Sequence, residues 1–406
     1  MNNELRGYLN NYILPQYKDN SNGHDLSHIQ YVTNRSVAFA NQINKQIDEG
    51  KLFGDKINLD MVEVIAAYHD LGHRIDAKTH EKISAEMLLD DKALKKWFTD
   101  SQILIMYDAV LEHRASVKKE PTNIYGKIVS SADRNTSIES ILRRTYEYSR
   151  NLYPVATTDE IVEEAYRHVV EKFGENGYAV GKMYFDDKEY ENFLQQVRVI
   201  TASKNVFRCV FIAVNNLNKE GLKSQIESYS PWNEQESVDK GAMLKFIDTF
   251  ADVVTRDNIF GHFTASAFVV NDSRTHALML HHNIMGDYIY PGGHADGEYD
   301  LYSVALREVE EETGLKVEPM FGKEIFAIQA APVKGHIKNS KYVPAHIHYD
   351  VLFVFKAKNE DMEKIRVLAS ENTSVEWWEL YDTFTRDCVV DWAKSVNKKI
   401  VQKMDY

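Results

Sequence analysis

The sequence predicts a multidomain protein in which an all-α half precedes a half of the α/β or α+β class. Apolar residues recur at helical spacing along most of residues 1–205, whereas residues 222–406 also contain stretches that alternate in polarity. A length of 406 residues also exceeds one typical hydrophobic core. We therefore expect one domain over residues 1–205 and a second over residues 222–406, joined by a connection at 206–221.

The first half is expected to consist of helices. The leading helix covers Leu5 to Ile13 and stops near Pro15, because proline interrupts a helix interior. A long helix should follow Asp25, and its buried face should carry Ile29, Val32, Ser36, Phe39 and Ile43. The same spacing predicts further helices over residues 62–71, 83–89, 103–111, 128–148, 159–173 and 187–202.

The second half mixes the two periodicities. A helix is expected over residues 231–256, followed by a strand at 262–270 and its partner at 277–281 after a turn at Asn271 and Asp272. The polar, turn-like stretch 215–221 precedes them and places the domain boundary. Later segments predict strands at 324–329, 346–356 and 375–380 and a C-terminal helix over 381–402.

Composition and charge limit the function classes. A hydrophobic fraction of 44% and a charged fraction of 27% are typical of a soluble globular protein. The net charge of −13 argues against a broad nucleic-acid or anionic-membrane surface, although it does not exclude phosphate substrates. The two cysteines, Cys209 and Cys388, suit a reducing compartment. Because no signal peptide and no apolar run of about 18 residues are found either, we expect a cytoplasmic protein without a membrane span.

A strongly acidic stretch stands out in the second half. Residues 308–312 contain four glutamates, within a helix expected over 300–313 with Asp300 as N-cap and Gly314 as the terminating glycine. Glu308, Glu311 and Glu312 share one face of that helix, where their charges repel unless a cation neutralises them. Clustered carboxylates suit Mg²⁺ or Mn²⁺, which bind protein carboxylates together with substrate phosphates.

This stretch resembles the Nudix box, Gly-x5-Glu-x7-Arg-Glu-U-x-Glu-Glu-x-Gly-U, where U is aliphatic. Gly293 fits the first position, and Arg307 and Glu308 follow at the required spacing. The sequence departs from the box at the first glutamate, which falls on Tyr299 with Glu298 one residue early. The remaining box positions are filled by Val309, Glu311, Glu312, Gly314 and Leu315.

The Nudix resemblance implies a mixed sheet covered by helices and a hydrolase that cleaves a nucleoside diphosphate linked to a moiety X. It implies that Glu308, Glu311 and Glu312 bind Mg²⁺ or Mn²⁺ around the diphosphate, with Arg307 in the catalytic set and Gly293 against the substrate. In the family the general base often lies outside the box. Our first candidate for it is Glu371, and the second is Asp350. His294 and His346 could touch substrate or be ordinary strand and turn residues.

In the first half, histidines and aspartates recur beside apolar residues that should face the core. They lie in HDLSHI (24–29), AAYHDLGH (66–73), THEKISAEML (79–88), VLEHRAS (110–116) and IVSSADRN (128–135). A lone histidine of this kind is usually a hydrogen-bonded core residue, but five such sites favour a metal centre. The order His28, His69-Asp70, Asp133 resembles the H…HD…D signature of the HD-domain metal phosphohydrolases.

The HD resemblance extends to two more histidines. His80 and His113 occupy the order of the additional ligands in binuclear HD sites, which implies that Asp70 bridges two ions. Imidazole and carboxylate together suit Fe, Mn, Co or Ni. His24 and His73 are weaker candidates. Three arginines near these ligands could hold phosphate oxygens or could form surface ion pairs: Arg74, Arg114 and Arg134.

Together these patterns favour a bifunctional metal-dependent phosphohydrolase that acts on small phosphorylated nucleotides or metabolites. The HD half would hydrolyse a nucleotide phosphoester or a dinucleoside polyphosphate. Two alternatives remain: a nucleotide-sensing protein in which one site binds without turnover, and a Nudix half that acts on RNA 5′ ends. The acidic balance and the lack of Lys/Arg runs speak against the RNA alternative, and the acidic balance also speaks against bulk nucleic-acid binding. The sequence does not indicate an oligomeric state.

Overall fold

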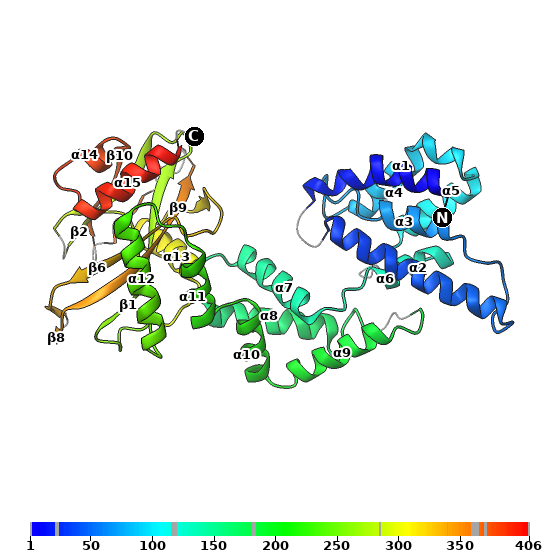
Figure 1. Cartoon of the computed structure of the whole chain (residues 1–406), viewed down its shortest axis with the longest axis horizontal. Coiled ribbons are helices and arrows are strands. Elements are labelled where there is room, and N and C mark those ends of the chain that lie inside the picture. The colour runs from blue at the N-terminus through cyan, green and yellow to red at the C-terminus, as the bar shows by residue number, and fades with distance from the viewer. Residues whose placement is uncertain are drawn as a thin grey trace. The chain divides into compact units, whose positions relative to one another are not determined.

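The computed structural model describes residues 2–20, 24–114, 120–180, 184–283, 286–338, 340–358, 365–368 and 372–404. The chain divides into two compact units, which are coloured from blue to red along the sequence in Figure 1. The first unit comprises Met1–Arg144 and Tyr166–Phe207, and the second comprises Thr145–Ala165 and Arg208–Tyr406. The domain limits expected from the sequence, at residues 205 and 222, stay a prediction.

The first unit is helical, as expected. The long helix α2 (Leu26–Asp48) begins where Asp25 accepts a hydrogen bond from the backbone N–H of His28 at 3.0 Å, and it buries the predicted face. The other helices that lie wholly in this unit are α1 (Asn3–Tyr8), α3 (Leu59–Tyr68), α4 (His80–Asp90), α5 (Asp100–Leu111), α6 (Ile124–Ala132) and α9 (Lys188–Thr201). Residues of both units occur in α7 (Ile138–Leu152), α8 (Thr158–Phe173) and α10 (Lys204–Val214).

The leading helix changes type instead of stopping near Pro15. One π-helical segment (Leu9–Ile13) follows α1, and a 3₁₀ segment (Leu14–Asp19) follows that. Pro15 lies in the first turn of the 3₁₀ segment, where its missing N–H would have no helical partner anyway. The chain therefore stays helical through Asp19.

The helix predicted over residues 128–148 is wrong as a single element. The chain leaves α6 at Asp133 and re-enters helix at α7 five residues later. Asn135 accepts a hydrogen bond from the backbone N–H of Ser137 at 2.8 Å, and Ser137 Oγ accepts one from the N–H of Ser140 at 3.2 Å. Short polar side chains here accept hydrogen bonds from backbone N–H groups in place of the helical carbonyls. This break places Asp133 at a helix end.

The second unit contains a mixed sheet with the order β10-β2-β1-β9-β5, which confirms the predicted fold class. Its central pair, β1 (Gly261–Asn271) and β9 (His346–Ala357), is parallel, and every other pair in this sheet is antiparallel. The outer members are β10 (Asn372–Glu379) and β5 (Val317–Pro319), and β2 (His276–His282) lies between β10 and β1. The branches are β3 (Tyr288–Ile289), β4 (Gly292–His294) and β6 (Ala327–Val333). A separate hairpin joins β7 (His336–Lys338) to β8 (Lys341–Val343).

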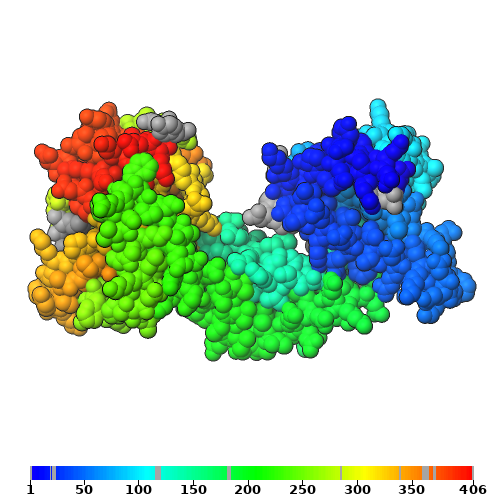
Figure 2. All heavy atoms as spheres, in the orientation of Figure 1, coloured from blue at the N-terminus to red at the C-terminus, as the bar shows by residue number. Residues whose placement is uncertain are grey.

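Helices cover both faces of this sheet. One face buries Phe263, Ala265 and Phe353 in the same apolar cluster as residues of α12 (Glu234–Thr249) and α13 (Leu301–Thr313). The opposite face packs Phe268 and Val354 with α15 (Asp391–Met404). In Figure 2 the helix α12 forms much of the green surface of this unit. The helix α11 (Lys219–Ser228) precedes it, and a short helix α14 (Asp382–Thr385) follows β10.

The predicted C-terminal helix over residues 381–402 is likewise interrupted. Between α14 and α15, the carbonyl of Cys388 accepts a hydrogen bond from the N–H of Tyr288 at 2.9 Å, and Val389 is buried. This pairing with β3 competes with helix formation at residues 386–390. The helix expected over 231–256 is shorter than predicted, because it starts at the Asn233 cap and ends at Thr249.

None of the helices in the described part of the chain is both long and apolar enough to span a membrane. The two cysteines, Cys209 and Cys388, are exposed and free.

Candidate functional site

Six metal-ligand candidates of the first unit come together around Asp70. Most of them lie at or just past a helix end, where a side chain can point along the helix axis. His69 and Asp70 directly follow α3, His80 opens α4, and His113 lies two residues after α5. The set is completed by Asp133, directly after α6, and by His28 on the buried side of α2.

The two carboxylate oxygens of Asp70 face different histidines. Oδ2 lies 3.5 Å from Nε2 of His28 and 3.5 Å from Nε2 of His69. Oδ1 lies 3.2 Å from Nε2 of His80 and 3.6 Å from Nε2 of His113. Asp133 joins the first group, since its Oδ1 lies 3.1 Å from Nε2 of His28 and 3.8 Å from Nε2 of His69. Asp70 therefore stands between two sets of imidazoles.

The backbone fixes the tautomers of three of these histidines. Nδ1 of His69, His80 and His113 each lies within hydrogen-bond distance of the carbonyl three residues earlier, at 2.8, 3.0 and 2.6 Å. A carbonyl only accepts, so each Nδ1 carries the proton, and the neutral ring then presents the Nε2 lone pair towards the carboxylates. Outer hydrogen bonds of this kind orient metal-binding histidines.

The residues present fit a cation between them. Nε2 of His28 and Nε2 of His69 are both buried without a hydrogen bond of acceptable geometry, although carboxylate oxygens lie nearby. Lone pairs that face carboxylate oxygens across 3 to 4 Å repel unless a proton or a metal ion lies between them. Imidazole nitrogens and carboxylate oxygens form the donor set that first-row transition metals accept.

Burial and neighbouring charges act in opposite directions on the pKa values in the cluster. Burial would lower the pKa of His28, but the carboxylates of Asp133 and Asp70 outweigh it and raise that pKa to about 9. For His69 burial dominates and lowers the pKa to about 4. Burial would raise the pKa of Asp70, yet the surrounding histidines hold it well below its usual range. Asp70 is therefore ionised.

Two residues at this cluster were missed or underrated from the sequence. Nδ1 of His24 lies 2.6 Å from Oδ2 of Asp70, and its ring stacks on that of His73 with centroids 3.9 Å apart. Arg144 on α7 places Nη2 at 3.3 Å from Nε2 of His24. The four-residue spacing of His24 and His28 was a usable signal for His24. No sequence signal marks Arg144.

The three arginines proposed for phosphate binding have other partners in the structure. Arg74 is exposed and donates to Oε1 of Gln16 at 2.9 Å. Arg114 donates to Oε2 of Glu81 at 3.1 Å, a carboxylate that lies 3.7 Å from Nδ1 of His80. Arg134 is buried with its guanidinium 4.9 Å from the ring centroid of Tyr190. Of the three, Arg114 lies beside a cluster residue, and the roles of all three stay predictions.

In the second unit, the acidic stretch forms α13 with the predicted ends. Oδ1 of Asp300 accepts a hydrogen bond from the N–H of Ser303 at the start, and Gly314 adopts φ 72° at the end. A residue with a side chain would be strained at that positive φ, so glycine is required there.

The helix carries its three box glutamates into different surroundings. Oε2 of Glu312 accepts from the N–H of Gly292 at 3.0 Å, and Oε1 accepts from Nδ2 of Asn372 at 2.8 Å. The carboxylate of Glu308 lies against Gly293, where an added Cβ would come within 2.3 Å of it. Glu311 is exposed, and its Oε1 lies 3.9 Å from Nε of Arg307. Glu308 and Glu312 thus both face the segment of Gly292 and Gly293.

The carboxylates of Glu308, Glu311 and Glu312 lie farther from one another than the ligand atoms around Asp70 do. Within the described residues, four groups of three candidate ligands have their ligand atoms within 4.8 Å of one another, and none of these groups contains Glu308, Glu311 or Glu312. The glutamate one residue early in the box, Glu298, accepts from the N–H of Thr158 at 3.0 Å. Tyr299 packs against the apolar cluster under the sheet.

Of the two candidates for the general base, Asp350 lies within the described residues and Glu371 does not. Asp350 is buried on β9 and accepts hydrogen bonds from Oγ1 of Thr264 at 2.7 Å and Oγ of Ser266 at 2.9 Å. Burial raises its pKa, against the effect of those two hydroxyls.

Comparison with protein-family models finds two domains in the chain. An HD domain matches residues 26–137, and a NUDIX domain matches residues 261–400. The first match contains all six residues of the cluster around Asp70, and the second contains α13 and the sheet. The comparison with curated proteins finds no match.

Solved structures that match include members of both kinds. A predicted HD superfamily hydrolase from an uncultured Thermotogales bacterium shares 24% identity, with 41% of this chain and 88% of that chain covered and a TM-score of 0.26. A NUDIX family hydrolase from Clostridium perfringens shares 18% identity, with 34% and 97% covered and a TM-score of 0.24. A UDP-X diphosphatase shares 12% identity, with 61% and 97% covered and a TM-score of 0.26.

The family models carry the assignment, and both describe families of hydrolases that generally depend on divalent metals. This result confirms the two resemblances that the motifs indicated. The chain is a hydrolase that joins an HD domain at residues 26–137 to a C-terminal NUDIX domain at residues 261–400.

Proposed function

We propose that the chain is a bifunctional metal-dependent phosphohydrolase for small phosphorylated nucleotides or metabolites. Its NUDIX half, proposed to span residues 222–406, cleaves the diphosphate of a nucleoside diphosphate linked to X. Its HD half, proposed to span residues 1–205, hydrolyses a nucleotide phosphoester or a dinucleoside polyphosphate. Residues 206–221 connect them.

One observation carries the HD part of this proposal, namely the position of Asp70 between two sets of imidazoles. Oδ2 of Asp70 faces His28 and His69, and Oδ1 faces His80 and His113. Such an arrangement suits two ions bridged by one carboxylate. In our assignment His28, His69 and Asp133 hold the first ion, and His80 and His113 hold the second.

The chemistry of the HD site follows from these donors. Iron, manganese, cobalt or nickel ions, when bound, activate water at neutral pH and neutralise charge on the phosphate. The protein's part is to hold the donors rigidly, through the backbone carbonyls that fix Nδ1 of His69, His80 and His113. Arg144, next to His24, can hold a phosphate oxygen at the same site.

In the NUDIX half, the proposed metal ligands are Glu308, Glu311 and Glu312, with Mg²⁺ or Mn²⁺ as the ion. Carboxylate oxygens suit these hard ions, which neutralise the diphosphate when bound. Gly293 lets the loop approach Glu308 closely, and the N–H of Gly292 binds Glu312, which supports a substrate position over the loop. Arg307 lies 3.9 Å from Glu311 and in this proposal orients that carboxylate.

Cellular location and partners are part of the same proposal. The two exposed, free cysteines suit a reducing compartment, so we place the protein in the cytoplasm. The net charge of −13 argues against a broad nucleic-acid surface and does not exclude small phosphorylated substrates, since bound metal ions and a few arginines can reverse the local sign.

A substrate panel on the full chain tests the function. The panel contains phosphomonoesters, cyclic phosphodiesters, dinucleoside polyphosphates and nucleoside diphosphates linked to sugars, each with Mg²⁺, Mn²⁺ or Fe²⁺. We expect diphosphate cleavage with Mg²⁺ or Mn²⁺ and phosphoester or polyphosphate hydrolysis with the transition metals, and we expect a chelator to abolish both. A chain that binds members of the panel without converting any would instead be a nucleotide sensor.

Metal content tests the two-ion assignment of the HD site. His80→Ala and His113→Ala should each lose about one of two transition-metal ions per site, because both imidazoles face the same oxygen of Asp70. Elemental analysis of the full chain measures this, with exposed Asp108 on α5 replaced by alanine as the control. Unchanged metal content in both histidine variants would contradict a second ion.

A further inference from the structure

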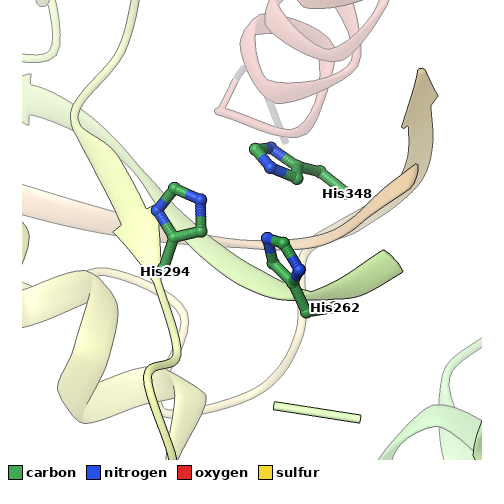
Figure 3. Close-up of side chains that lie close together, drawn as sticks. All are labelled: His262, His294 and His348. Atoms are coloured by element: carbon green, nitrogen blue, oxygen red, sulfur yellow. The ribbon is translucent and has the colours of Figure 1, made fainter. Parts of the chain in front are cut away.

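A second group of histidines lies in the NUDIX half, apart from the box glutamates. His262, the second residue of β1, lies directly opposite His348 on the parallel strand β9, and His294 on β4 pairs with Thr264, two residues further along β1. Side chains two residues apart on a strand point to the same face of a sheet. The three rings therefore converge on one face, as Figure 3 shows.

The distances within this group are those of a ligand set. One ring nitrogen from each of His262, His294 and His348 lies within 4.8 Å of the others, and the three ring centroids are 4.9 to 5.1 Å apart. Tetrahedral coordination at about 2.0–2.1 Å separates ligand nitrogens by roughly 3.3 Å. Small rotations about the side-chain bonds are enough to close that difference.

A fourth histidine adjoins the group. Nε2 of His346 lies 3.2 Å from Nε2 of His348, and its Nδ1 lies 2.8 Å from the carbonyl oxygen of Pro344. That carbonyl places the proton on Nδ1, so Nε2 of the neutral ring offers a lone pair. The 3.2 Å separation is close to the spacing of two nitrogens on one tetrahedral ion.

The surroundings of two of these histidines favour their uncharged forms. Burial lowers the pKa of His348 to about 2, together with the neighbouring histidines His294, His262 and His346. The pKa of His262 is lowered too, by burial and by His346, with a contact to the backbone of Asn258 opposing it in part.

His262 also has unmet hydrogen-bonding capacity. It is 4% exposed, and neither of its ring nitrogens has a hydrogen bond of acceptable geometry within the described residues. An unsatisfied buried polar group destabilises a fold, and such groups are rare in native structures. A metal ion between the rings would satisfy one nitrogen of His262.

We propose that His262, His294 and His348 bind one divalent transition-metal ion, with His346 at the edge of the site. Imidazole nitrogens select Zn²⁺ and its borderline neighbours over Mg²⁺, which prefers oxygen ligands. Three imidazole ligands leave a fourth position open to water or to an anionic oxygen. His294 directly follows Gly293, whose side-chain direction meets Glu308, and successive strand residues point to opposite faces of a sheet, so this ion lies on the face away from the box glutamates. The proposal does not depend on the catalytic role of the box.

The test is a Zn²⁺ titration of the full chain carrying Asp70→Ala, which removes the central carboxylate of the HD cluster. Excess Mg²⁺ is kept present to occupy the box carboxylates. We expect isothermal titration calorimetry and elemental analysis to show one Zn²⁺ per chain that Mg²⁺ does not displace. Adding His294→Gln and His348→Gln should weaken this binding by at least about 100-fold, since two direct ligands are lost.

The matched control is His276→Gln, a half-buried histidine of β2 that stands outside the group. It should bind Zn²⁺ as its parent does. Loading with Co²⁺ gives a second readout, because the visible d–d bands of a tetrahedral site should appear in the parent and the control and be absent from the double variant. Because His348 is half-buried, melting curves accompany each titration, and Zn²⁺ should raise Tm only where the two histidines are present.

Three results would overturn the proposal. The first is equal Zn²⁺ binding by the parent and by a folded double variant. The second is the absence of bound Zn²⁺ in the parent. The third applies if the double variant does not fold: His294→Gln alone would then bind Zn²⁺ as tightly as the His276→Gln control.

Discussion

Asp70→Ala is expected to lose most of the transition metal bound by the HD half. Its rate of phosphoester or polyphosphate hydrolysis should fall by at least about 1,000-fold. Asp70 supplies an oxygen to each of the two sets of imidazoles, so its removal leaves both ions without their shared ligand. Metal-ion catalysis is worth several kcal/mol, and each 1.36 kcal/mol corresponds to a tenfold rate change. Elemental analysis and steady-state assays on the full chain measure the two losses.

Asp108→Ala is the matched control, since Asp108 is an exposed carboxylate on the helix that precedes His113. It should keep both metal and activity. Asp70 is 1% exposed, so a circular dichroism melt must accompany the assay. A folded Asp70→Ala protein with wild-type metal content would rule out the site.

The second large effect is expected at the box. Glu308→Gln keeps the shape of the side chain but removes the charge proposed to hold Mg²⁺ or Mn²⁺, and it should lower diphosphate hydrolysis by at least about 100-fold. Glu311→Gln and Glu312→Gln should act in the same direction. Glu312 is buried and accepts from two N–H donors, so its amide variant would also place donor against donor and lose stability.

Glu310→Gln is the internal control for the box, since it removes a neighbouring charge from the same helix without touching the three proposed ligands. It should retain near wild-type hydrolysis in a Mg²⁺ titration. If Glu308→Gln and Glu311→Gln were as active as Glu310→Gln at every Mg²⁺ concentration, the carboxylates would not hold the catalytic metal.

The fold class and the HD cluster could be predicted because both depend on local patterns. Helical spacing gave the buried face of α2, and Asp25 marked its start. His28, His69, Asp70, His80, His113 and Asp133 follow the order of a known signature, and the structure brings all six together. The acidic helix was likewise marked by its own cap, Asp300, and its glycine, Gly314.

Features that depend on partners distant in sequence were not predictable. Cys388 pairs with Tyr288 across about a hundred residues, which interrupts the expected C-terminal helix. The break at Asn135 and Ser137 has a different cause, because short local hydrogen bonds there compete with the helix that the apolar spacing predicts. The group of His262, His294 and His348 depends on the register of three strands. The alternation of His346 and His348 was the one usable signal for it.

The structure adds an arginine that the sequence spacing did not mark. Arg74 and Arg134 were proposed because they follow ligands closely in sequence, yet they contact Gln16 and Tyr190. Arg144, eleven residues beyond Asp133, is the arginine beside His24. Side-chain direction, rather than distance along the chain, decides which cation reaches a site.

The measurement that tests our central claim most directly is a crossed assay of two substrate classes on four full-length proteins. Wild type, Asp70→Ala, Glu308→Gln and the combined variant are each supplied with a nucleoside diphosphate linked to X and with the phosphoester or polyphosphate that wild type hydrolyses best, and products are followed by chromatography. Two separate centres predict that Asp70→Ala keeps diphosphate cleavage, that Glu308→Gln keeps phosphoester hydrolysis, and that the combined variant loses both. Loss of both activities in either single variant, in a protein that melts like wild type, would contradict two independent hydrolytic sites in one chain.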